Sequence, residues 1–279
     1  MPVKVVADSV SDLPLQVVEE LGITVIPLNV RFGDEVYRDG IDLTNEQFYQ
    51  RLTTNKILPV TSVPSPATFA TAYDKLAEET DQILAIIVSS KLSGTHEVAL
   101  QSIGLMKRKC RVEVVDSGWA VMAQGFLIMA AARAAQAGAK LDEVVNIVRA
   151  NMHRVDMRAA FDTLEYLRRG GRIGAAQALL GSALRIHPII TIKNGVVEPA
   201  GRARSRAKAI DHLYQFATSY SHIDELAVEN AACPADADLL VERFSARFPE
   251  KRIYRTNTTP VIGTHTGPGL LLVAVMGDK

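Results

Sequence analysis

One stretch of the chain, residues 83–99, constrains the fold most. It reads ILAIIVSSKLSGTHEVA, in which an unbroken apolar run over residues 83–88 is followed by a polar turn and then by a segment with helical spacing. A strand that is apolar on both faces is buried in a parallel sheet, and ligands of such sheets bind beyond the carboxyl ends of the strands. We therefore expect an α/β fold with a functional site near the turn after Val88.

Ser93 suits two roles in this turn. Its hydroxyl could cap the helix that follows by accepting a bond from a backbone N–H group. The first turn of a helix also leaves N–H groups unpaired, and the helix dipole favours an anion there. Both roles, a structural cap and a ligand contact, stay open at this point.

Composition limits the classes of partner. The 279 residues contain 31 Lys and Arg against 31 Asp and Glu, so no global field attracts nucleic acid or an anionic membrane. Cys110 and Cys233 stand far apart without a metal-binding spacing, which argues against structural zinc and a disulfide framework. No apolar run approaches the roughly 18 residues needed to span a bilayer, and we expect a soluble protein of the cytoplasm.

The first half alternates between strands and helices. We expect strands at residues 3–7, 23–32, 83–88 and 112–115, and an extended loop over the proline-rich residues 59–66. Helices should run from Ser11 or Asp12 to Leu21, from the capping box of Thr44 and Gln47, from Ser65, and over residues 120–137 and 141–154. This alternation predicts an N-terminal α/β domain, residues 1–155, with a mainly parallel sheet.

The second half predicts a C-terminal α/β domain, residues 156–279, with a mixed sheet. Asn194-Gly195 is a strong hairpin signal between strands at residues 186–192 and 196–199. Asp162 and Glu165 form a capping-box pattern that should open a helix ended by Gly170 and Gly171. Further helices are expected at residues 175–184, 206–218 and 237–248, and further strands at 226–229, 253–257 and 270–275.

Two other segments carry candidate functional side chains. Residues 260–269, PVIGTHTGPG, are expected to form a loop in which glycines and prolines hold His265 rigidly. Such a histidine is as consistent with a structural role as with a functional one. In the proline-rich loop, capping explains Ser65 but leaves the hydroxyls of Thr61 and Ser62 unused.

Acidic and basic residues allow further interpretations. Asp8 and Asp116 each precede a serine after a strand, a pattern that favours hydrogen-bonded turns over metal ligation. Ser93 and His265 with either aspartate could also form a hydrolase triad, although no GxSxG motif accompanies it. Seven arginines gather in one span and could form a solvated face or meet a phosphate or acidic partner. They are Arg168, Arg169, Arg172, Arg185, Arg202, Arg204 and Arg206.

Six ordered motifs make the sequence resemble the DegV family over nearly its whole length. They are DSVSDLP at 8–14, DGIDLT at 39–44, TSVPSP at 61–66, SSKLSGT at 89–95, DTLEYLRRGGRI at 162–173 and PVIGTHTGPG at 260–269. The resemblance implies a bacterial, cytoplasmic two-domain protein that holds a long-chain fatty acid such as palmitate in the cleft between its domains. It also implies that a separate fatty acid kinase converts the presented carboxyl group to an acyl phosphate, which feeds phospholipid synthesis from exogenous or recycled fatty acids.

The resemblance implies a lipid-binding protein and no enzyme, with no cofactor, no bound metal, no nucleic acid partner and at most transient membrane contact. Six residues would bind the fatty acid carboxylate: Thr61, Ser62, Ser93, Gly94, Thr264 and His265. Arg202 and Arg172 would lie at the head group and face the kinase. The alternative from the enzyme class is an esterase-like hydrolase that uses Ser93 and His265.

The energetics of such a ligand favour the tail. Burying about 15 methylenes at ~0.8 kcal/mol each supplies on the order of 10 kcal/mol before the cost of binding. Hydrogen bonds to the carboxylate mostly replace lost hydration, so the head-group residues should fix orientation. The sequence departs from the family pattern at residues that should shape the tunnel, namely Val63, His96, Glu97, Trp119, Val121 and Ala123.

Overall fold

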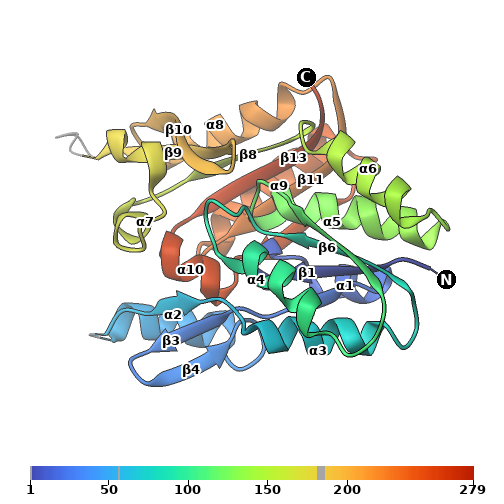
Figure 1. Cartoon of the computed structure of the whole chain (residues 1–279). Coiled ribbons are helices and arrows are strands. Elements are labelled where there is room, and N and C mark those ends of the chain that lie inside the picture. Colours follow the sequence, from blue (N-terminus) through green and yellow to red (C-terminus); the bar gives the residue numbers. More distant parts are fainter. Residues whose placement is uncertain (1, 56, 181–185) are drawn as a thin grey trace.

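The computed structural model describes residues 2–55, 57–180 and 186–279, and three sheets organise it (Figure 1). The first sheet is parallel and has the strand order β2-β1-β6-β7. Its strands are β1 (Lys4–Asp8), β2 (Thr24–Ile26), β6 (Gln82–Ile87) and β7 (Arg111–Asp116). Every residue of β6 after Gln82 is buried, as expected for a strand covered on both faces.

Helices cover both faces of this parallel sheet. One face packs against α3 (Pro66–Leu76) and α4 (Thr95–Gln101), and the other against α1 (Leu15–Leu21), α5 (Val121–Gln136) and α6 (Leu141–Asn151). The expected layer arrangement of the first half, with a mainly parallel sheet between helices, is confirmed.

The second sheet has six strands in the order β10-β9-β8-β13-β11-β12 and mixes parallel and antiparallel pairs. Its strands are β8 (Val155–Ala160), β9 (His187–Lys193), β10 (Val196–Ala203), β11 (His222–Asn230), β12 (Ile253–Asn257) and β13 (Leu271–Asp278). Helices α8 (Arg206–Thr218) and α9 (Pro234–Arg247) pack against it. The mixed sheet and its Asn194-Gly195 hairpin between β9 and β10 are therefore confirmed.

A third, small sheet lies beside these two. It joins β3 (Asn29–Phe32), β4 (Glu35–Arg38) and β5 (Val60–Ser62) in antiparallel pairs, next to α2 (Asn45–Thr54). The short helix α10 (Pro260–Thr266) packs against α2, β3, β5 and α7 (Glu165–Arg169). Short 3-10 helices are formed by Ser9–Ser11, Ser102–Leu105 and Gly174–Leu179.

Helix α5 joins the two large sheets. It contacts β1 and β6 of the parallel sheet and also β8, β11 and β13 of the mixed sheet. Twelve of its sixteen residues are buried, which is the pattern of a helix enclosed on all sides. One apolar core therefore includes residues from both halves, for example Val6, Phe126 and Ala274. The domain boundary near Val155 stays a prediction.

The largest difference from expectation is α10. Residues 260–269 were expected to form a loop because of their glycines and prolines, but Pro260–Thr266 is a helix. Proline is favourable in the first turn of a helix, where its missing N–H group is not needed. His265 therefore lies in the last turn of a helix.

Three expected caps are wrong. The first helix begins at Leu15 and not after Ser11 or Asp12, since Asp12 adopts a left-handed conformation. Gly94, and not Ser93, is the N-cap residue of α4, although the Ser93 hydroxyl accepts from the N–H of Thr95 at 3.4 Å, as expected of a capping side chain. Leu164 precedes α7, and Asp162 lies outside that helix.

Two expected segments differ in type. The proline-rich loop contains strand β5, because Val60–Ser62 pairs with β3. The helix expected over residues 175–184 is a 3-10 helix at Gly174–Leu179, and its expected end at 181–184 lies outside the described residues, as does Arg185. The capping box of Thr44 and Gln47 and the N-cap at Ser65 are confirmed.

The position of α5 predicts a large cost for truncating its central aromatic side chain. Phe126 is fully buried and packs near the ring of Tyr254. Replacement of Phe126 by Ala should lower the free energy of unfolding by about 3–5 kcal/mol, because the enclosed site can collapse only partly. Urea denaturation measures this loss, with Leu239→Ala on the exposed side of α9 as the control. A loss below about 1 kcal/mol for Phe126→Ala would contradict an enclosed α5.

Candidate functional site

An apolar cavity lies where the turn after β6, the start of α5, the mixed sheet and α10 meet. Its empty space measures about 780 Å³, including the space open to solvent at its mouth. Apolar side chains form most of its wall, among them Phe161, Leu167, Ile190, Ile192, Leu270 and Leu272.

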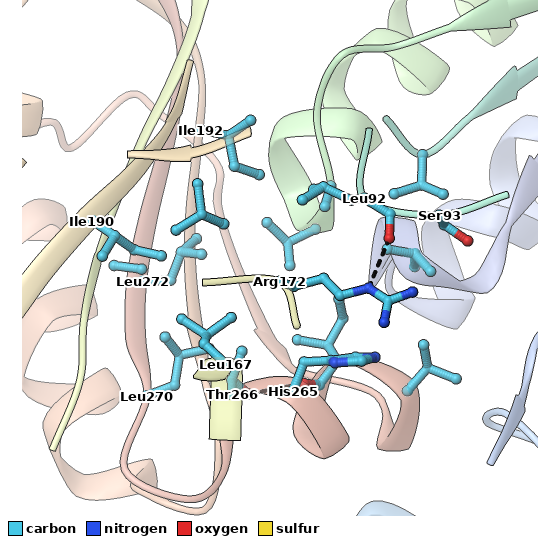
Figure 2. Close-up of a pocket in the computed structure, with 18 of the residues that line it drawn as sticks. Leu92, Ser93, Leu167, Arg172, Ile190, Ile192, His265, Thr266, Leu270 and Leu272 are labelled. Carbon is cyan, nitrogen blue, oxygen red and sulfur yellow. Dashed lines mark hydrogen bonds between the residues drawn. The ribbon is translucent and has the colours of Figure 1, made fainter. Parts of the chain in front are cut away.

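The polar side chains of the cavity gather away from its apolar wall. Figure 2 shows Ser93, Arg172 and His265 on one side, and Ile190, Leu270 and Leu272 on the other. Five polar side chains line the cavity in all: Thr61, Ser93, Arg172, His265 and Thr266. The cavity is therefore amphipathic, with a polar end and a larger apolar part.

His265 is the most buried ionisable group at this polar end. Its Nε2 atom lies 2.9 Å from Oγ1 of Thr61, while Nδ1 is buried and has no partner among the described residues. Burial, with a smaller contribution from the charge of Arg172, lowers the pKa of His265 to about 4. The ring is therefore neutral at pH 7. If Nε2–H donates to Thr61 Oγ1, the Thr61 hydroxyl is free to donate to a ligand oxygen.

Glycines allow the close packing around His265. A Cβ atom on Gly170 would lie 2.2 Å from Nδ1 of His265, and one on Gly267 would lie 2.2 Å from the ring of Tyr166. Gly267 also has a φ of +69°, which side chains rarely permit. The glycines of both motifs therefore let the end of α7 and the end of α10 meet at the polar end of the cavity.

Arg172 joins this end of the cavity to the turn after β6. Its Nε atom donates to the carbonyl of Leu92 at 3.0 Å (Figure 2), and Nη1 donates to the carbonyl of Gly170 at 2.6 Å. Across the described chain, no carboxylate forms an ion pair with Arg172. Its positive charge is therefore available to an anion in the cavity mouth.

The opposite wall contains a strained residue. Val121, at the start of α5, lines the cavity and has a φ of +56°. A β-branched residue rarely adopts this conformation, and the strain costs on the order of 1–3 kcal/mol. Ser93, at the polar end, is held by its own turn, because its Oγ atom lies 2.8 Å from Oγ1 of Thr95.

The structure brings together only some of the residues expected in the site. Thr61, Ser93, Arg172 and His265 line one cavity, but Ser62, Gly94 and Thr264 do not. Ser62 and Gly94 are exposed, and the buried Thr264 hydroxyl donates to the carbonyl of Pro260. Arg202 lies elsewhere, on β10, beside Arg204 and Lys208 in a separate hollow.

Sequence reasoning missed Thr266 and most of the apolar wall. Thr266 follows His265 directly, and only the unexpected helix at Pro260–Thr266 turns both toward the cavity. Most of the wall residues lie on or directly beside β8, β9 and β13, and their apolar pattern marks them only as core. No local signal separates a cavity wall from a packed core.

The geometry does not assemble the hydrolase alternative. Ser93 Oγ bonds to Thr95, whereas Nε2 of His265 bonds to Thr61. Asp8 accepts from the N–H groups of Val88 and Val10, and Asp116 accepts from Ser90. Neither aspartate reaches the imidazole, so nothing orients it as a base toward Ser93.

The polar end also faces a hollow on the protein surface. Thr61, Arg172 and His265 line both the apolar cavity and this outer hollow, which further includes Val60, Tyr166 and Arg169. A group bound by these three side chains would therefore be reachable from outside.

The described residues contain neither a metal-binding cluster nor a helix suited to span a membrane. No group of three or more His, Cys, Asp or Glu side chains in residues 2–55, 57–180 and 186–279 has an arrangement that could hold a metal ion. In the same ranges, no helix is long and apolar enough to cross a bilayer.

Comparisons with known proteins agree with this architecture. The family described as "Uncharacterised protein, DegV family" matches residues 2–278. A DegV domain-containing protein of Streptomyces coelicolor is 39% identical over 279 residues, covering 98% of each chain. A DegV family protein from Thermus thermophilus, described for its fatty acid binding, has a TM-score of 0.91 at 32% identity, covering 99% of this chain and 100% of that one. DegV of Bacillus subtilis, described as a fatty acid binding protein, has a TM-score of 0.90 at 31% identity, covering 99% of each chain.

The burial of His265 predicts an unusually acidic titration. Its ring resonances should titrate near pH 4 in NMR spectra, compared with about 6.5 for an exposed histidine. Because the folded-state pKa is lowered, the stability that the neutral ring contributes is complete above pH 6.5 and is lost as the pH falls toward 4. Arg172→Gln should raise the midpoint by removing a nearby positive charge, whereas Arg168→Gln should not. An ordinary midpoint in the wild-type protein would contradict the buried position.

Proposed function

This chain belongs to the DegV family, and we propose that it binds one long-chain fatty acid, with the tail in the apolar cavity and the carboxylate at Thr61, Ser93 and His265. The observation that carries this proposal is an apolar cavity with its few polar side chains gathered at one end. The structural relatives described as fatty acid binding proteins support the same ligand class.

The apolar wall supplies the affinity in this proposal. About 15 buried methylenes at ~0.8 kcal/mol each contribute on the order of 10 kcal/mol before the cost of binding. A polar or highly charged ligand would leave this wall unused and would lose hydration without compensation. A single acyl chain therefore matches the chemistry of the cavity.

The polar end suits a carboxylate for two reasons. The hydroxyls of Thr61 and Ser93 can donate to its oxygens, and the neutral His265 keeps the Thr61 hydroxyl oriented. Arg172 adds a positive charge at the cavity mouth while its other donors stay bound to backbone carbonyls. Charge-assisted hydrogen bonds of this kind contribute about 1.5–3 kcal/mol each, much of it offset by lost hydration.

We further propose that the bound carboxyl group is presented to a separate, cytoplasmic fatty acid kinase, which forms the acyl phosphate. The outer hollow beside Arg169 and Arg172 supports this step, because it gives a partner access to the polar end. Arg202 and Arg204 are exposed and belong to none of the ion pairs found in the described chain, so they could bind an acidic partner surface.

Mass spectrometry of an organic extract tests the ligand. The purified protein should contain a long-chain fatty acid in near-stoichiometric amount, and Thr61→Val should weaken its binding about tenfold through loss of one hydrogen bond to a charged group. Thr218→Val is the matched control, because the Thr218 hydroxyl bonds only to carbonyls of its own helix. Absence of any fatty acid from the wild-type extract would refute the proposal.

Charge reversal tests the partner surface. Arg202→Glu or Arg204→Glu should abolish phosphorylation of the bound fatty acid by the kinase, while fatty acid binding stays within about twofold of wild type. Arg247→Glu, at the end of α9, should change neither activity. Equal losses of binding and phosphorylation at Arg202 would show that this arginine supports the cavity and not the partner contact.

A further inference from the structure

Four carboxylates are buried together between the two large sheets, and the proposed binding step uses none of them. Asp8, Asp12, Asp39 and Glu229 are at most 3% exposed. Each accepts at least one backbone N–H bond, but Oδ2 of Asp12, Oδ2 of Asp39 and Oε2 of Glu229 are buried without a partner among the described residues. Such atoms are costly unless something satisfies them.

Two of these carboxylates hold the helix that carries His265. Asp12 Oδ1 accepts from the N–H of Thr259 at 3.0 Å, and Asp39 Oδ1 accepts from the N–H of Val261 at 3.0 Å. Both N–H groups belong to the start of α10 and would otherwise be unpaired. The first two sequence motifs, at 8–14 and 39–44, therefore support α10 through their aspartates, and the first of them also contributes Val10 to the cavity wall.

Glu229 holds the opposite wall of the cavity. Its Oε1 atom accepts from the N–H of Met122 at 2.7 Å, in the first turn of α5. Met122 follows Val121, whose strained backbone places its side chain in the cavity wall. Glu229 is therefore in a position to maintain that conformation.

Asp12 and Glu229 are adjacent across this interface, and no cation neutralises them. Burial raises the pKa of both groups, that of Glu229 to about 8, and their mutual repulsion raises the pKa of Asp12 further. Neither takes part in an ion pair within the part of the chain that the structure describes. Two adjacent buried carboxylates are strongly disfavoured when both are ionised, and each of these side chains has one oxygen without a partner, Oδ2 of Asp12 and Oε2 of Glu229, that can carry or accept a proton.

We propose that Asp12 and Glu229 share one proton between Oδ2 and Oε2, and that this O–H···O bond positions α10 and the start of α5 around the cavity. The bond connects the segment before α1 to strand β11, so it joins residues from the first and second halves of the chain. The shared proton is independent of the proposed ligand, whereas its effect on the cavity rests on the proposed fatty acid site.

The titratable groups around Asp12 and Glu229 have pKa values that differ from that of the pair. The charge of Asp39 acts on both Asp12 and Asp8, and burial raises the pKa of Asp39 and of Asp8 to about 6. Tyr49, from α2, is bonded to Thr258, and burial raises its pKa above the physiological range. From α5, the amide of Gln124 donates to Asp8. Between about pH 7 and 8, where the pair loses its proton, Asp8 and Asp39 should therefore be mostly ionised and Tyr49 neutral.

Unfolding experiments between pH 5 and 9 test the shared proton. The folded pair keeps a proton that the unfolded chain, with carboxyl pKa values near 4, has lost, so wild-type stability should fall as the pH rises toward 8. Glu229→Gln keeps an acceptor for Met122 and gives Asp12 a permanent donor. Relative to this variant, the wild-type unfolding constant should rise by up to tenfold per pH unit and level off above pH 8.

Glu242→Gln provides the control, because it makes the same chemical change on the exposed side of α9 and should follow the wild-type curve. Parallel curves for wild type and Glu229→Gln would overturn the proposal. Asp12→Asn gives the same expectation if Glu229→Gln does not fold. Carbon-13 NMR of the wild-type carboxyl groups should also show one protonated carboxyl in the pair at pH 7, and two ionised carboxylates there would overturn the shared proton.

Fatty acid retention tests the second half of the proposal separately. Wild-type protein loaded with palmitate should release it faster above pH 8, while Glu229→Gln should retain it. If the unfolding curves differ as expected but both proteins retain palmitate equally, the shared proton stands and its effect on the cavity is rejected. If no variant binds palmitate at any pH, the proposed function fails, and the unfolding curves still decide on the shared proton.

Discussion

The hydrogen bonds at the start of α10 are the interaction on which the site depends. This helix has only seven residues, too few to be stable by itself, and it contains a glycine. It forms because carboxylates from distant motifs, Asp12 and Asp39, accept its first N–H groups, and because its apolar residues Val261 and Ile262 are buried. Without these contacts His265 would have no fixed position relative to Thr61.

The cavity exists because α5 separates two sheets that lie on either side of it. The helix fills the space between the sheets along most of its length, but its first turn leaves room beside Val121. The parallel sheet contributes the turn with Ser93 at the carboxyl ends of its strands, where ligands of such sheets usually bind. The mixed sheet contributes the apolar wall, so each sheet supplies a different part of the binding chemistry.

Features set by local interactions could be predicted from the sequence. The buried strand before Ser93 and the Asn194-Gly195 hairpin depend on residues close together in the chain, and both are present. The helix at Pro260–Thr266 could not be predicted in this way, because the partner of Thr259 lies 247 residues away at Asp12. The same holds for Asp12 as a cap: its local pattern fits a helix start, but its carboxylate is used by another helix.

The candidate site, like the fold, combines residues that local sequence patterns indicate with residues that only the folded chain brings together. Unused hydroxyls and a rigidly framed imidazole identified Thr61, Ser93 and His265, yet only the fold shows that Arg172 reaches the turn after β6 through the carbonyl of Leu92. A cavity whose apolar wall provides most of the binding free energy needs few polar groups. Those groups must be held rigidly if they are to bind the polar end of the ligand in one orientation. The close glycine contact at Gly170 and the buried carboxylates behind α10 provide that rigidity, which explains how Asp12 and Asp39 support the site although neither side chain lines the cavity.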